Sequence, residues 1–263
     1  MKNQGLIRKA YVILQMLIVS LLLLSVDTAS ARLTAQANHD HITVDFFYHG
    51  STVSVRGISD PNTDIIIKLT SEDAHQTLRK KGRVGGFLWM NVGELEIEHA
   101  PKVYSLHSTK NVEDILSKDE LDKYVIGYPS LESHVNMNAS DEGEKTRWFN
   151  EFVKFKESSN LYATTAGKIS LTEKDGIQNY YILTQWPFQA PPGRYTVTVY
   201  AVKNKKVVET ATSGVLVEQV GMVRSFADMA KNNAAVYGII SIFAALSAGF
   251  GVGLVFRKSG GAH

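Results

Sequence analysis

The sequence predicts a mainly β protein with a helical insertion and one C-terminal transmembrane helix. Three observations support this fold class. Apolar and polar residues alternate with period two over much of the chain, as they do in half-buried strands. Residues 109–160 instead show helical spacing. Residues 234–256 carry no charge, and at about 1.5 Å per residue they can cross a hydrocarbon layer of about 30 Å as one helix.

The first 31 residues have the pattern of a signal peptide. A basic start, residues 2–9, precedes an apolar run, residues 11–24, and Ala29-Ser30-Ala31 fits the small-x-small pattern that a signal peptidase cleaves. We expect cleavage after Ala31; an uncleaved signal anchor is the alternative. In both cases the middle of the chain is exported. The positive-inside rule then places the basic tail, residues 257–263, in the cytoplasm.

Composition restricts what the exported part, residues 32–219, can be. The chain has no cysteine, which excludes disulfides, a lipoprotein anchor, thiolate metal sites, iron–sulfur clusters and covalently attached haem. Five of the 28 basic and one of the 26 acidic residues lie in the signal and the tail, so 23 and 25 remain in residues 32–256, for a formal charge of −2. The overall pI of about 8.6 therefore reflects the topology signals, and we expect no nucleic-acid partner.

The N-terminal half of the exported part is predicted to be a β-meander. Ile42, Val44 and Phe46 should share one face of a strand, and residues 53–55 repeat the alternation. Asp60-Pro61-Asn62 forms a turn, because proline presets φ and the flanking side chains bond locally. A more fully buried strand is expected at residues 64–69, and further strands at residues 87–91, 95–98 and 103–107.

The helical insertion contains short helices and one longer helix. Residues 112–116 have helical spacing, and Ser117 with Glu120 forms a capping box that starts a second short helix. The strongest helix covers residues 141–158. We interpret its apolar face as the surface that docks on the sheet rather than as a ligand cleft; it consists of Trp148, Phe149, Phe152, Val153 and Phe155.

Strands return after the insertion, at residues 168–172 and 180–184. Pro191-Pro192-Gly193 then leads into an alternating run, residues 195–201, and Lys203-Asn204-Lys205 provides the turn of a hairpin whose second strand covers residues 207–217. A Pro-Gly-x-Tyr entry into a long strand, followed by a closing hairpin, is typical of immunoglobulin-like β-sandwiches. We therefore predict that fold, which by itself says nothing about function.

Six segments of the chain resemble a known family: residues 80–91, KKGRVGGFLWMN, residues 100–104, APKVY, residues 127–128, 161–162 and 192–195, and the membrane-proximal GMVR of residues 221–224. The chain resembles, over nearly its whole mature length, the transmembrane protein family first described from alphaproteobacteria (Alph_Pro_TM). Where the family has an Ile-Trp-Val-Asn run, this chain has Phe87-Leu88-Trp89-Met90-Asn91, so no exact side-chain role is carried over there.

The resemblance implies a cellular context rather than a mechanism. Genes of the family are commonly found beside membrane permeases of the sulfite-exporter (TauE/SafE) type, which implies an accessory subunit for the export of sulfite, a related sulfur oxyanion or an organosulfonate. The family shares the layout expected here: a signal, an exported β-rich domain and one C-terminal span.

No motif of catalysis is found in the sequence. It lacks a Gly-x-Ser-x-Gly elbow, a His-Glu-x-x-His pair and a phosphate-binding glycine loop. We therefore predict a non-enzymatic periplasmic accessory subunit in the bacterial inner membrane, with a permease and the lipid bilayer as partners and no cofactor. One rival is a periplasmic metal-binding or respiratory-complex assembly factor. Another is an enzyme subunit whose cofactor is bound by a partner.

A weak candidate metal site lies near the mature N-terminus. His39 and His41 flank Asp40, and on an extended strand residues i and i+2 face the same side, where two imidazoles could share a copper or zinc ion. His49 follows a few residues later. The alternative, which we favour, is a solvated segment without metal.

A basic segment is the stronger candidate for function on the exported domain. It holds four cations around Gly82, and a tryptophan and an asparagine follow it: Arg79, Lys80, Lys81, Arg83, Trp89 and Asn91. Guanidinium forks match the oxygens of sulfite or a sulfonate, so the segment could hold an oxyanion. Anionic lipid headgroups, an acidic patch on a partner, or solvent around a plain hairpin are the alternatives.

The predicted span carries a stripe of small residues at every fourth position: Ser241, Ala245, Gly249 and Gly253. Such a face allows another helix to approach closely, whereas a helix that serves only as an anchor does not need it. Just before the span, residues 220–233 form an amphipathic segment. Its apolar side, Val223, Phe226 and Met229, is expected to lie along the outer membrane interface.

Overall fold

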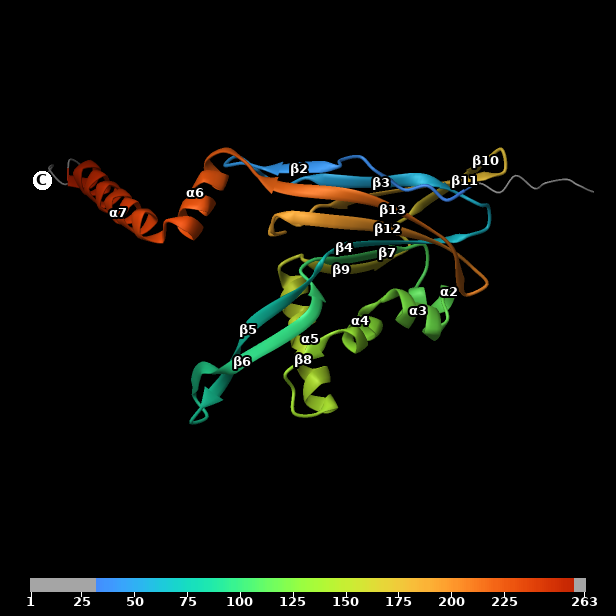
Figure 1. Cartoon of the computed structure of the whole chain (residues 1–263), viewed down its shortest axis with the longest axis horizontal. Coiled ribbons are helices and arrows are strands. Elements are labelled where there is room, and N and C mark those ends of the chain that lie inside the picture. The colour runs from blue at the N-terminus through green and yellow to red at the C-terminus, as the bar shows by residue number, and fades with distance from the viewer. Residues whose placement is uncertain (1–31, 258–263) are drawn as a thin grey trace, which may run out of the picture. The chain divides into compact units, whose positions relative to one another are not determined.

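The computed structural model describes residues 32–257 and is mainly β, as predicted (Figure 1). The expected signal peptide, residues 1–31, and residues 258–263 lie outside the described residues. Two sheets form a sandwich. The first is antiparallel and has the order β1 (Gln36–Ala37), β3 (Thr52–Ser59), β11 (Ile177–Gln185) and β10 (Ser170–Lys174).

The second sheet has six strands. Its order is β2 (His41–Val44), β13 (Lys206–Gln219), β12 (Gly193–Lys203), β4 (Asp64–Ser71), β7 (Tyr104–Ser108) and β9 (Tyr162–Ala166). β2 pairs with β13, and β9 with β7, in parallel; the other neighbours are antiparallel. Buried side chains from both sheets meet in one core, which includes Val53, Val55, Ile65, Ile67, Tyr180, Ile182, Val197 and Val199.

The strand order confirms the immunoglobulin-like sandwich. Across the first sheet, β1-β3-β11-β10 corresponds to strands A-B-E-D of that fold, and across the second, β13-β12-β4-β7 corresponds to G-F-C-C′. The Tyr195 hydroxyl donates to the Pro191 carbonyl, which forms the tyrosine corner at the start of the F-like strand. The Trp186 ring packs edge-on against Tyr195, with ring centroids 4.8 Å apart. The Pro-Gly-x-Tyr segment therefore leads into the long strand and closing hairpin, β12 and β13, that the sequence predicts.

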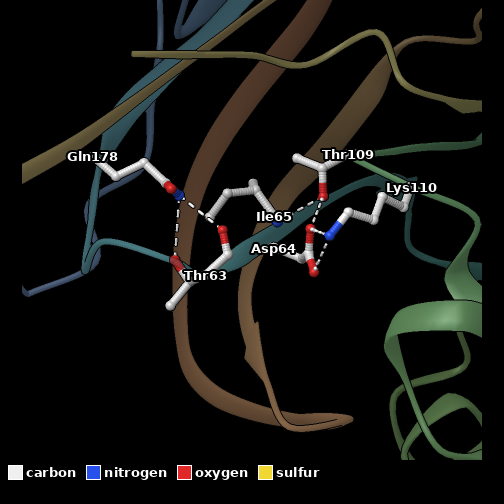
Figure 2. A network of polar contacts seen from close by, with 6 residues as sticks. All are labelled: Thr63, Asp64, Ile65, Thr109, Lys110 and Gln178. Carbon is white, nitrogen blue, oxygen red and sulfur yellow. Dashed lines mark hydrogen bonds and ion pairs between the residues drawn. The ribbon is translucent and has the colours of Figure 1, made fainter. Parts of the chain in front are cut away.

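A polar network fixes the turn between β3 and β4 (Figure 2). The buried Gln178 amide on β11 donates to the Thr63 carbonyl at 2.8 Å. The neighbouring Asp64 carboxylate accepts from the Thr109 hydroxyl at 2.9 Å and pairs with Lys110 at 3.0 Å. The network thus joins the first sheet to the start of β4 and β4 to the segment where the insertion begins.

The insertion adds a second core on the outer face of the six-stranded sheet (Figure 1). Its helices are α2 (Val112–Ile115), α3 (Lys118–Tyr124), α4 (Tyr128–His134) and α5 (Glu142–Ser158). Phe149 and Phe152 of α5 pack there with Tyr162 and Ile66 of the sheet. The docking face predicted for α5 is confirmed except at Phe155, whose side chain is 51% exposed.

A third sheet combines a long hairpin, β5 (Asp73–Val84) and β6 (Leu88–Pro101), with the short β8 (Asn136–Met137). Two expectations from the sequence are wrong in this part of the fold. β6 is one strand instead of two, and β5 was not predicted, because Leu78 is its only large apolar residue before Val84. Phe46 is also misplaced: β2 ends at Val44, and Phe46 is 69% exposed.

The chain ends in two helices. α6 (Gly221–Asn232) has no buried residue, and α7 (Ala234–Arg257) follows after Asn233. Within the described residues, α7 is the one helix long and apolar enough to cross a membrane, over residues Ala234–Leu254. The predicted C-terminal transmembrane helix is therefore present in the structure.

Candidate functional site

The β5–β6 hairpin carries the basic segment that the sequence singles out. Its strands are joined by Gly85-Gly86-Phe87, and Val84 pairs with Leu88 on either side of this loop. Both glycines have positive φ, 65° and 82°, a conformation that disfavours residues with a Cβ. The sequence therefore forms a tight tip here, and the aromatic Phe87 is placed at its end with 82% of its surface exposed.

The hairpin separates the basic residues onto two faces, because side chains alternate along a strand. On one face, Lys81 lies opposite Asn91 and Arg83 lies opposite Trp89. The Arg83 guanidinium carbon is 5.1 Å from the centre of the Trp89 ring. Arg79 belongs to the same face of β5.

Lys80 points to the opposite side of the hairpin. Its ammonium lies 5.1 Å from the centre of the Trp148 ring on α5. The structure therefore brings five of the six predicted residues to one face, whereas Lys80 contacts the helical insertion.

The face that carries Lys80 is apolar along most of its length. Near the base of the hairpin, Leu78, Leu95 and Ile97 pack into the second core. The register shifts between Lys80 and Lys81, where β6 contains Val92 as an extra residue. A Cβ at Gly82 would lie 2.9 Å from the Val92 methyl groups, so the Val92 side chain covers Gly82 and lies on this same face.

Beyond the register shift, none of residues 32–257 covers this face. Four apolar side chains stand there with about half of their surface exposed: Val84 at 48%, Leu88 at 51%, Met90 at 47% and Val92 at 54%. We call residues 80–92 the hairpin end. The sequence pattern of residues 87–91 predicts a strand, but it does not show that the apolar side of this strand is left exposed.

A buried lysine ties the base of the hairpin to α5. Lys156 is only 5% exposed, and its ammonium donates to the Gln76 side-chain oxygen at 2.6 Å and to the Lys102 carbonyl at 3.2 Å. Burial lowers the pKa of Lys156 to about 8. Gln76 in turn donates to the Ala100 carbonyl on β6, so the bonds join the helix to both strands.

The two candidate metal ligands are not neighbours on one strand. His41 begins β2, and its ring nitrogen lies 3.1 Å from a Glu218 carboxylate oxygen on β13. His39 lies in the irregular segment between β1 and β2. Across residues 32–257, no group of three or more His, Asp or Glu side chains is arranged to hold a metal ion.

A hydroxyl–imidazole chain lies on β7 and β9. His107 contacts the Ser105 hydroxyl at 3.0 Å and the Thr165 hydroxyl at 2.6 Å, and Ser105 lines an open cleft of about 590 Å³ at the end of the sandwich. Burial lowers the pKa of His107 to about 4, so the imidazole is neutral at pH 7. A catalytic triad has a carboxylate in the third position to stabilise an imidazolium, and Thr165 does not supply one.

The small-residue stripe lies along one side of α7, because residues four apart are stacked on a helix. The Ser241 hydroxyl donates to the Tyr237 carbonyl at 2.8 Å, which satisfies this polar group within the span. Nothing lies within 4 Å of a Cβ placed at Gly249 or at Gly253. Within the described residues all sides of the span are exposed, so this face is distinguished by its small side chains alone.

Comparison with known proteins identifies the family. Residues 32–258 match the family described as "Putative transmembrane protein (Alph_Pro_TM)". The match begins at the residue after the predicted cleavage site, and it includes the sandwich, the hairpin and α7. No curated protein and no solved structure matches the chain. Because the match covers most of its length, the chain belongs to this family of transmembrane proteins.

Proposed function

We propose that the protein is a non-enzymatic accessory subunit of an integral membrane permease, anchored by α7 in the bacterial inner membrane with its sandwich in the periplasm. The observation that carries the proposal is the stripe of small residues along one side of α7, Ser241, Ala245, Gly249 and Gly253. A span that only anchors a domain needs hydrophobicity, whereas close packing of two helices needs small residues on one side. The orientation rests on the basic residues that flank the span at its C-terminal end.

The solute and the kind of permease rest on the family. The family resemblance implies genes that lie beside permeases of the sulfite-exporter type, and this implication favours sulfite, a related sulfur oxyanion or an organosulfonate as the exported compound. In this proposal the permease carries the solute. The accessory subunit supplies a folded domain at the periplasmic exit and a span that holds the two proteins together.

The proposal is tested by changing the stripe on α7 without changing the hydrophobicity of the span. Gly249→Leu or Gly253→Leu places a bulky side chain where the two helix backbones approach each other, so we expect co-purification with the permease in mild detergent to fall at least tenfold. Solute export from intact cells should fall with it.

Val236→Leu and Ile240→Leu are the matched controls, because both residues lie on the side of α7 away from the stripe and both substitutions are apolar. Insertion into the membrane should be unchanged in all four variants. Equal retention of the permease by all four would show that α7 is an anchor only, and the proposal would then be wrong.

A further inference from the structure

We propose that the hairpin end, residues 80–92, inserts into the interface of the lipid bilayer that anchors the protein and binds anionic phospholipid headgroups there. The proposal does not depend on the permease. It rests on the exposed apolar side chains of this segment, on its charge, and on its connection to a membrane-spanning helix.

The hairpin end exposes several apolar side chains next to one another rather than a single isolated one. Phe87 at the tip and Trp89 on the basic face are 82% and 62% exposed, and the four half-exposed side chains of the other face continue the apolar surface. Contiguous exposed apolar surface of this kind marks an interaction site. Mixed aliphatic and aromatic side chains with tryptophan at the edge match the composition of membrane-interface segments.

The charge of the hairpin end favours anionic lipid over an apolar protein surface. Residues 80–92 contain Lys80, Lys81 and Arg83 and no acidic residue, although the chain between signal and tail has a formal charge of −2. Lys81 and Arg83 lie on the face that also carries Trp89. If the apolar face and the tip enter the acyl boundary, these cations can extend to the phosphate groups.

The backbone limits how deep the hairpin end can go. β8 pairs with β6 only at Ile97 and Glu98, so within the described residues the outer edges of the hairpin end have no strand partner. Unpaired backbone groups are not tolerated in the hydrocarbon core. The hairpin end is therefore restricted to the headgroup region and the upper acyl chains, where water and headgroups satisfy these edges.

Because the protein is anchored by α7, the hairpin end can bind lipid even if its own affinity for the bilayer is low. α7 ties the domain to the bilayer, so binding of the hairpin end is intramolecular and takes place at a high effective lipid concentration. A contact too weak to recruit a soluble protein to the membrane can therefore be occupied here.

The test uses the full-length protein reconstituted alone into vesicles. Because the chain has no cysteine, Phe87→Cys can carry one environment-sensitive fluorophore, and Thr77→Cys, exposed nearer the base of β5, provides the control. The vesicles are phosphatidylcholine alone or with about 30% phosphatidylglycerol. With the anionic lipid, we expect the label at residue 87 to shift to the blue and to be quenched by headgroup-region nitroxide lipids, and the label at residue 77 to remain aqueous.

Charge variants test the headgroup contact. Lys81→Gln and Arg83→Gln should each lower the equilibrium constant of the contact, obtained from quenching at increasing phosphatidylglycerol content, about fivefold, because each basic residue near an anionic surface contributes about 1 kcal/mol. Lys174→Gln removes an exposed charge on β10 and should have no effect. Unfolding midpoints measured alongside show that the sandwich is intact in each variant.

Three outcomes would overturn the proposal. The label at residue 87 could remain aqueous in both kinds of vesicle. It could be shielded only at high protein density, which would identify a second copy as the occupant. It could be shielded only after the permease is added, which would make the hairpin end a protein-docking surface. Since the permease is absent from the main experiment, its result is independent of the span variants above.

Discussion

The two halves of the long hairpin have the same apolar face and different surroundings. At the base, Leu95 is 3% exposed and lies under the helical insertion; at the end, Leu88 on the same face is 51% exposed. Both leucines belong to β6, and both oppose a residue of β5 that points the same way. An apolar stripe on a strand therefore indicates a face that can be buried. Whether it is buried depends on which other segment of the chain packs against it.

The largest expected effect separates these two leucines. Leu95→Ala should lower the free energy of unfolding by about 2–5 kcal/mol, because it leaves a cavity in the second core. Leu88→Ala, the same change on the same face, should alter it by less than about 0.5 kcal/mol, because its side chain is already half in solvent. Denaturant unfolding of both variants in detergent measures the difference, and equal losses would contradict the distinction between base and end.

An intermediate effect concerns the lysine that holds the base. Burial lowers the pKa of Lys156 to about 8 from 10.5, so above pH 8 the unfolded chain binds more protons than the folded one and the free energy of unfolding rises with pH. The contribution of each such lysine to the slope approaches about 1.4 kcal/mol per pH unit. Towards about pH 9.5 it is increasingly opposed by tyrosines such as Tyr195 and Tyr200, whose pKa burial raises to about 12 and which ionise near about pH 10 in the unfolded chain.

Lys156→Met should reduce this slope between about pH 8 and pH 9.5 without abolishing it. Lys68, whose pKa burial also lowers to about 8, remains and contributes with the same sign. Lys154→Met, on the exposed side of α5, should leave the slope as in the unchanged protein. Unfolding curves recorded across this pH range provide the measurement. An unchanged slope in Lys156→Met would show that this lysine is not the titrating group.

The smallest expected effect lies at the end of the hairpin. Arg83→Gln removes the stacking on Trp89, and at an exposed site such a contact contributes about 0.5–1 kcal/mol. We expect the free energy of unfolding to fall by no more than this, with Lys174→Gln as the unaffected control. A fall in the free energy of unfolding of more than about 2 kcal/mol would mean that the hairpin end is part of the folded core and not an exposed surface.

Part of the candidate site follows from local pattern, and part does not. The sequence located the basic segment, the aromatic residue beside it and the stripe on α7, because each is visible as residue type at a fixed spacing. It could not show that Lys80 contacts Trp148, since Trp148 lies 68 positions further along the chain. It also missed β5, whose exposed face is polar and whose inner face is apolar mainly at Leu78 and Val84.

By itself, the sequence determined the elements whose physics is local. An uncharged run fixes the span, helical spacing fixes α5, and the Pro-Gly-x-Tyr segment fixes the corner and the closing hairpin of an immunoglobulin-like sandwich. Only the tertiary structure decided the parallel pairing of β2 with β13 and of β9 with β7, and which half of the hairpin is covered. The reason is that pairing and burial depend on residues far apart in the chain, whereas periodicity reports only the face that a segment can bury.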